Sequence, residues 1–62
     1  MNIERLLEIL KEKHITRYRL AKLSGISESA IARLINEKNK DAKISTVKAI
    51  AKALQVDINE II

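Results

Sequence analysis

The amino-acid sequence predicts an all-α fold, one domain of five short helices spanning residues 1–62, and three observations carry this prediction. The chain has 62 residues, which is too few for two hydrophobic cores. It contains one glycine, no proline and one aromatic residue, Tyr18, whereas a β-sandwich or barrel needs several glycine or proline turns and usually an aromatic core. Its apolar residues recur at helical spacing in successive short segments.

The first expected helix carries one apolar stripe at i, i+3, i+4 and i+7, formed by Ile3, Leu6, Leu7 and Leu10. Thr16 is a good N-cap for a second helix, from Arg17 to about Ser24, with Leu20, Ala21 and Leu23 facing inward. Gly25 ends this helix because glycine accepts the left-handed backbone of a helix C-terminus. We expect His14 and Tyr18 to pack at the joint between these two helices.

The second half of the chain shows the same kind of pattern. Ser27 is expected to cap a third helix with an inward stripe of Ile31, Leu34 and Ile35. Residues 36–41 contain no apolar side chain and predict a loop. Ser45 is expected to cap a fourth helix with Val47, Ile50, Ala51 and Leu54 facing inward. Asp57 and Glu60 form a capping-box pattern for a last short helix, whose apolar residues are Ile58, Ile61 and Ile62.

The short join between the second and third helices predicts a helix-turn-helix unit over about residues 16–36. Only Gly25 and Ile26 separate the two helices, and a glycine suits the sharp turn of this motif. Ala21 is small where the third helix must cross closely, and the wedge between the helices is filled by Leu20, Ile26, Ile31 and Leu34. A helical hairpin can mimic this order of apolar residues.

The charge distribution indicates a surface that meets phosphate. Lys and Arg number 12 against 8 Asp and Glu, which gives a net charge of +4. Nine of the basic residues and only four acidic ones lie between Lys11 and Lys43. A basic centre with nearly neutral flanks is typical of a nucleic-acid-binding domain, although a solvated face explains it equally well.

Other classes of protein are disfavoured by composition. No cysteine is present, and His14 is the only histidine, so we expect no disulfide, metal or other cofactor. A helical domain of this size has little room for a water-excluding pocket, so we expect neither catalysis nor a small-molecule ligand. No stretch has the length of a membrane span and no signal-peptide pattern begins the chain, which predicts a cytoplasmic protein without a membrane partner.

Two runs of sequence resemble one known family. TRYRLAKLSGIS, from Thr16 to Ser27, followed by Ile31, Leu34 and Asn36, is similar to the helix-turn-helix of the lambda-repressor/Cro-like (XRE) family. ISTVKAIAKALQV, residues 44–56, resembles the fourth helix of that family, which a short fifth helix usually follows. The resemblance covers nearly the whole chain. It implies a five-helix domain that places its third helix in the DNA major groove, usually as a dimer on a palindromic operator.

Three positions depart from the family pattern. Glu37 and Gln55 stand where family members usually have glycine, and Ala42 stands where proline is common. Each departure replaces a residue with special backbone properties by an ordinary one. They indicate either a loop of different geometry or an engineered chain.

The resemblance also implies which residues meet DNA. Base edges would be contacted from the start of the third helix by Ser27, Glu28, Ser29, Ala32 and Arg33. Arg33 is the strongest candidate because a guanidinium bonds guanine O6 and N7 together. Glu28 suits cytosine N4 but equally suits the first turn of any helix. The phosphate contacts would be Thr16, Arg17, Asn36, Lys38, Asn39, Lys40 and Lys43, and the alternative for the lysines is a solvated loop.

These observations together predict sequence-specific binding of double-stranded DNA and transcriptional repression. The alternative is an engineered or diverged helix-turn-helix scaffold that acts as a protein-interaction module, and a third possibility is an antitoxin that binds a toxin and its own operator. Four branched apolar residues close the chain, Val56, Ile58, Ile61 and Ile62. Because so small a core has room for only one or two of them, we expect a weak homodimer through the C-terminal helix.

Overall fold

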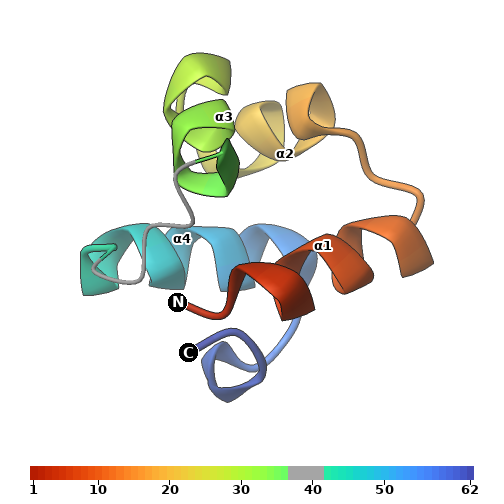
Figure 1. Ribbon diagram of the computed structural model, residues 1–62, viewed down its shortest axis with the longest axis vertical. Helices are drawn as coiled ribbons and strands as arrows, with labels where there is room; N and C mark the ends of the chain where they lie inside the picture. Colours follow the sequence, from red (N-terminus) through yellow and green to blue (C-terminus); the bar gives the residue numbers. More distant parts are fainter. Residues whose placement is uncertain (37–41) are drawn as a thin grey trace.

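The computed structural model of this chain describes residues 1–36 and 42–62. Within this part of the chain all regular structure is helical (Figure 1). The elements are α1 (Ile3–Glu12), α2 (Arg17–Ser24), α3 (Glu28–Asn36), α4 (Ile44–Leu54) and a 3₁₀ turn, η1 (Ile58–Glu60). The all-α prediction is therefore confirmed, with four α-helices in the described residues in place of the expected five.

The expected fifth helix is a single 3₁₀ turn. The Asp57 carboxylate accepts from the Asn59 N–H at 2.8 Å, and Glu60 N–H donates to the Asp57 carbonyl at 2.9 Å, three residues back. The carboxylate of Glu60 accepts a hydrogen bond from Arg5 of α1. The tight turn brings Ile61 into the core, where it is fully buried. Bonds between residues three apart, from Glu60 N–H to the Asp57 carbonyl and from Ile61 N–H to the Ile58 carbonyl, give the turn its 3₁₀ geometry.

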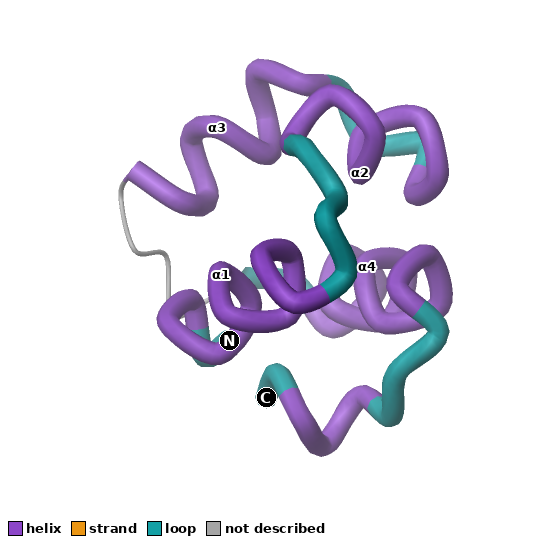
Figure 2. Tube along the Cα trace, turned by 90° about the vertical axis from the view of Figure 1, so that its right-hand side faces the viewer, coloured by secondary structure: helices purple, strands orange, loops and turns teal. Residues whose placement is uncertain are grey.

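The helices form two layers. Figures 1 and 2 show α2 and α3 above α1 and α4, with the C-terminal turn beneath α4. α2 packs on both α3 and α4, so it connects the two layers. The two ends of the chain lie side by side, joined by a 2.7 Å hydrogen bond from Asn2 N–H to the Ile61 carbonyl. None of the described helices is long and apolar enough to cross a membrane.

One hydrophobic core fills the space between the layers. Its buried residues are Ile3, Leu6, Ile9, Leu10, Leu20, Ile31, Leu34, Ile35, Val47, Ile50, Ala51, Leu54 and Ile61. The predicted inward stripes of α3 and α4 are confirmed. The stripe of α1 is wrong at one position, because Leu7 is 41% exposed and Ile9 is buried in its place. Leu23 is also exposed, since α2 buries only the face that carries Leu20.

Side chains cap three helices at their N-termini. Two of these caps, Thr16 and Ser27, were predicted from the sequence. Thr16 Oγ1 accepts from Arg19 N–H at 3.1 Å, and Ser27 Oγ accepts from Ala30 N–H at 3.2 Å. Asn2 caps α1 in the same way. The prediction for Ser45 is wrong, because Val47 N–H already bonds to the Lys43 carbonyl and α4 therefore begins at Ile44. Ser45 lies inside the first turn.

Three described residues with left-handed backbone lie at the C-terminal ends of helices. Gly25 has φ +77°, as predicted, but His14 and Gln55 have φ +55° and +57° without being glycine. After α4, Gln55 N–H bonds to the Lys52 carbonyl and Val56 N–H to the Ala51 carbonyl, the paired bonds of a Schellman motif. His14 takes the corresponding place after α1 and is exposed, as is Tyr18, so neither packs at the joint as expected.

Candidate nucleic-acid interface

The turn between α2 and α3 holds the two helices in a fixed relation. Gly25 N–H donates to the Ala21 carbonyl at 3.0 Å, and Ile26 N–H donates to Ser24 Oγ at 3.2 Å. Beneath the turn, Leu20 of α2 and Ile31 of α3 are both fully buried. These backbone bonds and buried contacts hold α3 on the outside of the molecule (Figure 2). The predicted helix-turn-helix geometry is present.

The outer face of α3 collects the residues proposed to meet bases. Ser27, Glu28, Ser29 and Arg33 are exposed and Ala32 is half-buried, opposite the buried stripe of the helix. Positions 28, 29, 32, 33 and 36 follow one face of a helix, so these side chains share one surface. Arg33 forms no ion pair with any described residue, which leaves its planar donor group available for a ligand. Ser27 Oγ already accepts the capping bond from Ala30 N–H, so its hydroxyl hydrogen remains available to donate a hydrogen bond to a ligand.

The expected phosphate-binding residues fall into three groups. Thr16 and Arg17 lie exposed at the N-terminus of α2, where free amides and the helix dipole favour an anion. Asn36 ends α3 and Lys43 precedes α4, and both are exposed. Lys38, Asn39 and Lys40 lie outside the described residues, as does Glu37. The structure therefore places two parts of the predicted phosphate surface and leaves the third as a sequence prediction.

Most carboxylates of the described residues lie in the lower layer and the C-terminal turn, whereas cations are present in both layers. In the lower layer, Arg5 donates to Glu8 at 3.2 Å, to Glu12 at 3.4 Å and to Glu60 at 3.0 Å. The bond to Glu60 is the main reason that the pKa of the Arg5 guanidinium is raised above its ordinary value. In the upper layer, α2 carries three cations, Arg17, Arg19 and Lys22, and no acidic residue. Carboxylates thus gather on the side away from the outer face of α2, which leaves a positive surface there.

Lys22 and Tyr18 form a contact that the sequence analysis missed. The Lys22 ammonium lies 4.8 Å from the centre of the Tyr18 ring on the exposed side of α2. The i, i+4 spacing of an aromatic and a lysine was the available signal.

Comparison with protein families agrees with this geometry. Residues 5–62 match the model of the Cro/C1-type HTH DNA-binding domain. The chain belongs to this family. No curated protein and no solved structure matches it. The resemblance deduced from the helix-turn-helix residues is therefore confirmed over nearly the entire length of the chain.

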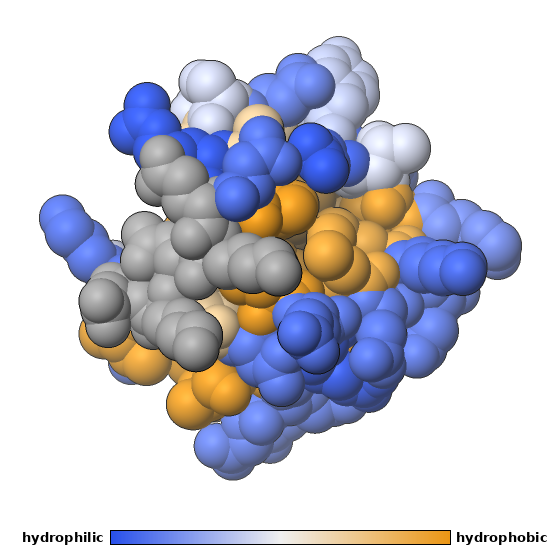
Figure 3. Space-filling view, viewed as in Figure 1, coloured by the Kyte–Doolittle hydropathy of each residue, from blue (hydrophilic) through white to orange (hydrophobic). Residues whose placement is uncertain are grey.

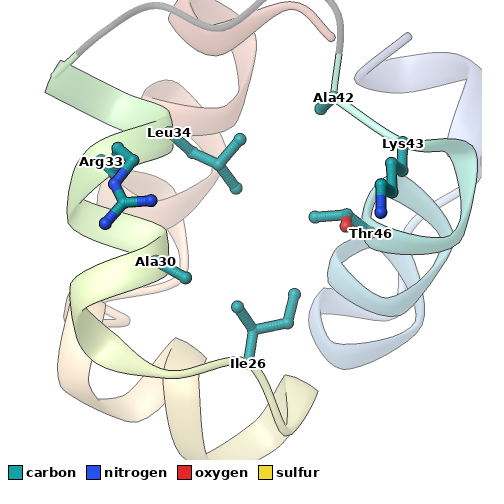
Figure 4. A pocket seen from close by; sticks show the side chains of 7 residues that line it. All are labelled: Ile26, Ala30, Arg33, Leu34, Ala42, Lys43 and Thr46. Atoms are coloured by element: carbon teal, nitrogen blue, oxygen red, sulfur yellow. The ribbon is translucent and has the colours of Figure 1, made fainter.

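This Cro/C1-type domain also has a groove that the sequence analysis did not predict. It has a volume of about 490 Å³ and lies between α3 and the start of α4 (Figure 4). Its lining residues are Ile26, Ala30, Arg33, Leu34, Ala42, Lys43 and Thr46. They come from the helix-turn-helix turn, from α3 and from the start of α4, so no spacing within one segment could have identified them.

Proposed function

We propose that this domain binds double-stranded DNA in a sequence-specific manner and represses transcription by occupying its site. The observation that carries the proposal is the exposed face of α3, which presents Arg33, without an ion pair to any described residue, on a helix held by a buried helix-turn-helix core. A major groove about 12 Å wide admits such a helix. The family assignment supports DNA as the partner.

The side chains of α3 suit a mixture of base contacts. Arg33 bonds guanine O6 and N7, Ser29 bonds either kind of base edge, and Ala32 meets a thymine methyl group. Glu28 accepts from cytosine N4 and disfavours a phosphate at the same place. Thr16, Arg17, Asn36 and Lys43 contact the phosphate backbone, together with Lys38, Asn39 and Lys40, and these contacts set orientation rather than sequence.

We also propose that two copies bind a palindromic site as a weak homodimer. Val56 and Ile58 are half-buried against the core and Ile61 is fully buried, whereas Ile62 remains 62% exposed. Ile62 is therefore the C-terminal side chain available to cover a neighbour. A single domain of this type offers a footprint of about 600–1,000 Å², and two copies would set their α3 helices roughly 34 Å apart. Sedimentation at rising protein concentration, with and without a palindromic duplex, measures this assembly, and a monomer throughout would contradict it.

A salt titration tests DNA binding itself. If about four to six phosphates are neutralised per monomer, the logarithm of the binding constant falls against the logarithm of salt concentration with a slope of roughly −4 to −5. A flat titration, or no binding to any duplex at low salt, would favour a protein-interaction module instead.

Two arginine substitutions separate base recognition from phosphate binding. Arg33→Ala should weaken binding to the preferred site by about 1–3 kcal/mol and relax the preference at one base position. Arg17→Ala removes the same charge from the N-terminus of α2 and should weaken specific and random DNA alike. Both are measured by fluorescence anisotropy on a selected site and on a scrambled duplex. Equal losses on both duplexes for Arg33→Ala would make it only another phosphate contact.

A further inference from the structure

The groove between α3 and α4 has a mixed lining of apolar and polar side chains. Its apolar lining residues are Ile26, Leu34, Ala30 and Ala42, and the two alanines leave space because their side chains are small. In Figure 4, Leu34 of α3 and Thr46 of α4 lie on facing walls, and Ile26 lies at one end. On the face of the molecule drawn in Figure 3, hydrophobic side chains are exposed between the polar side chains of the upper and lower layers, whereas the groove itself is drawn in Figure 4. The volume of about 490 Å³ lies within the range of small-molecule sites.

The polar side chains among the described residues of this groove are two cations and one hydroxyl group. Arg33 and Lys43 are exposed on opposite walls, and neither forms an ion pair with a described residue. Thr46 adds a hydroxyl group, and none of the described lining residues is acidic. A guanidinium binds a carboxylate with two parallel hydrogen bonds, and an ammonium adds a second cation to the same group.

We propose that this groove binds a small organic anion with an apolar body, such as an aryl or alkyl carboxylate. The body of the ligand lies against Ile26, Ala30 and Leu34, and its carboxylate lies between Arg33 and Lys43. A neutral ligand lacks the charge interactions with Arg33 and Lys43, and a small inorganic anion or acetate lacks the apolar contacts. Affinity for the proposed ligand therefore requires both of its parts.

Binding of the anion opposes binding of DNA because both use Arg33. This step rests on the proposed function, in which the Arg33 guanidinium contacts guanine. One guanidinium fork cannot hold a carboxylate and a base edge together, so each ligand lowers the affinity for the other by the same factor. The groove thereby makes DNA occupancy sensitive to the concentration of a metabolite-sized acid.

Titration of the free domain with 4-phenylbutyrate tests the site without DNA. We expect saturable shifts of the backbone amide resonances of the groove residues, with a dissociation constant on the order of 0.1–1 mM for a ligand of this size. The neutral amide of the same acid and sodium acetate are the matched probes, and each should bind at least about fivefold more weakly. Absence of saturable shifts overturns the proposal, and equal binding of the neutral amide overturns its anionic character.

Charge-matched variants locate the site. Arg33→Gln and Lys43→Gln should each weaken phenylbutyrate binding about five- to tenfold. Lys52 is an exposed lysine of α4 outside the groove, so Lys52→Gln should leave binding within about twofold. Ala30→Leu fills the groove and should abolish binding, and circular dichroism checks that this variant stays helical. If Lys43→Gln and Lys52→Gln have the same effect, the anion binds elsewhere.

A second titration measures the opposition to DNA. Saturating phenylbutyrate should lower duplex affinity at least about threefold relative to an equal concentration of sodium acetate, which controls for ionic strength. If the domain binds no duplex without ligand, the proposed function fails while the anion site is still judged by the first titration. If phenylbutyrate and the duplex both bind and phenylbutyrate leaves the duplex affinity unchanged, the shared use of Arg33 is overturned.

Discussion

Gln55→Gly should stabilise this domain, against the usual effect of placing glycine next to a helix. Gln55 has φ +57° and ψ +42° at the end of α4, and its side chain is exposed. Left-handed backbone costs an L-residue about 1–2 kcal/mol, because Cβ approaches the following carbonyl oxygen. Glycine avoids that cost but loses about 0.5–1 kcal/mol through the greater freedom of its unfolded chain. The expected net gain in unfolding free energy is about 0.5–1 kcal/mol.

Two other substitutions provide the controls for this prediction. Lys48→Gly introduces glycine at an exposed interior position of α4, where φ is negative, and should lose about 1 kcal/mol. Gly25→Ala is the reciprocal change, since Gly25 has φ +77° and a Cβ there would meet no heavy atom within 4 Å. Its cost of about 1 kcal/mol therefore arises from backbone conformation alone.

Urea titration and thermal unfolding followed by circular dichroism measure all three variants. For a domain of this length, a gain of 0.5–1 kcal/mol corresponds to a rise of roughly 2–8 °C in the melting temperature. If Gln55→Gly destabilises the domain as much as Lys48→Gly does, the residue is not held in left-handed conformation and the reasoning fails.

Two further pairs of substitutions compare sequence signals with packing. Thr16→Ala should lower the free energy of unfolding by about 1 kcal/mol because the Thr16 Oγ1 caps α2. Ser45→Ala should change it by less than about 0.5 kcal/mol because Ser45 is not the N-cap of α4. Equal losses for the two variants in urea titrations would contradict the observed start of α4. Ile61→Ala should cost about 2–5 kcal/mol because the side chain is fully buried, whereas the neighbouring exposed Ile62→Ala should cost less than about 0.5 kcal/mol in thermal melts of the monomer. In sedimentation on a palindromic duplex the second change should nevertheless reduce dimer formation, and an unchanged dimer would exclude Ile62 from the interface.

Local sequence signals were sufficient for most of the helices and for the helix-turn-helix. The caps at Thr16 and Ser27 and the left-handed Gly25 each depend on groups three or four residues apart, which the sequence displays directly. The inward stripe of α3 follows from the same short spacing. The composition of its outer face was equally visible, since a residue that is not on the buried stripe of a short helix has only solvent or a partner to face.

Tertiary packing decided what those signals left open. Leu7 and Ile9 are both apolar and both lie within one turn of Leu6, so only contact with the rest of the core determined that Ile9 is buried. The left-handed backbone at His14 and Gln55 accompanies local hydrogen bonds after α1 and α4. Neither residue type favours this conformation, so only the family's glycine at the position of Gln55 pointed to it in the sequence. The groove between α3 and α4 lies beyond any local pattern, because its walls are distant in sequence and meet only when the two helices pack. A side chain's neighbours across such a space are determined by the whole fold, and the sequence specifies them only through it.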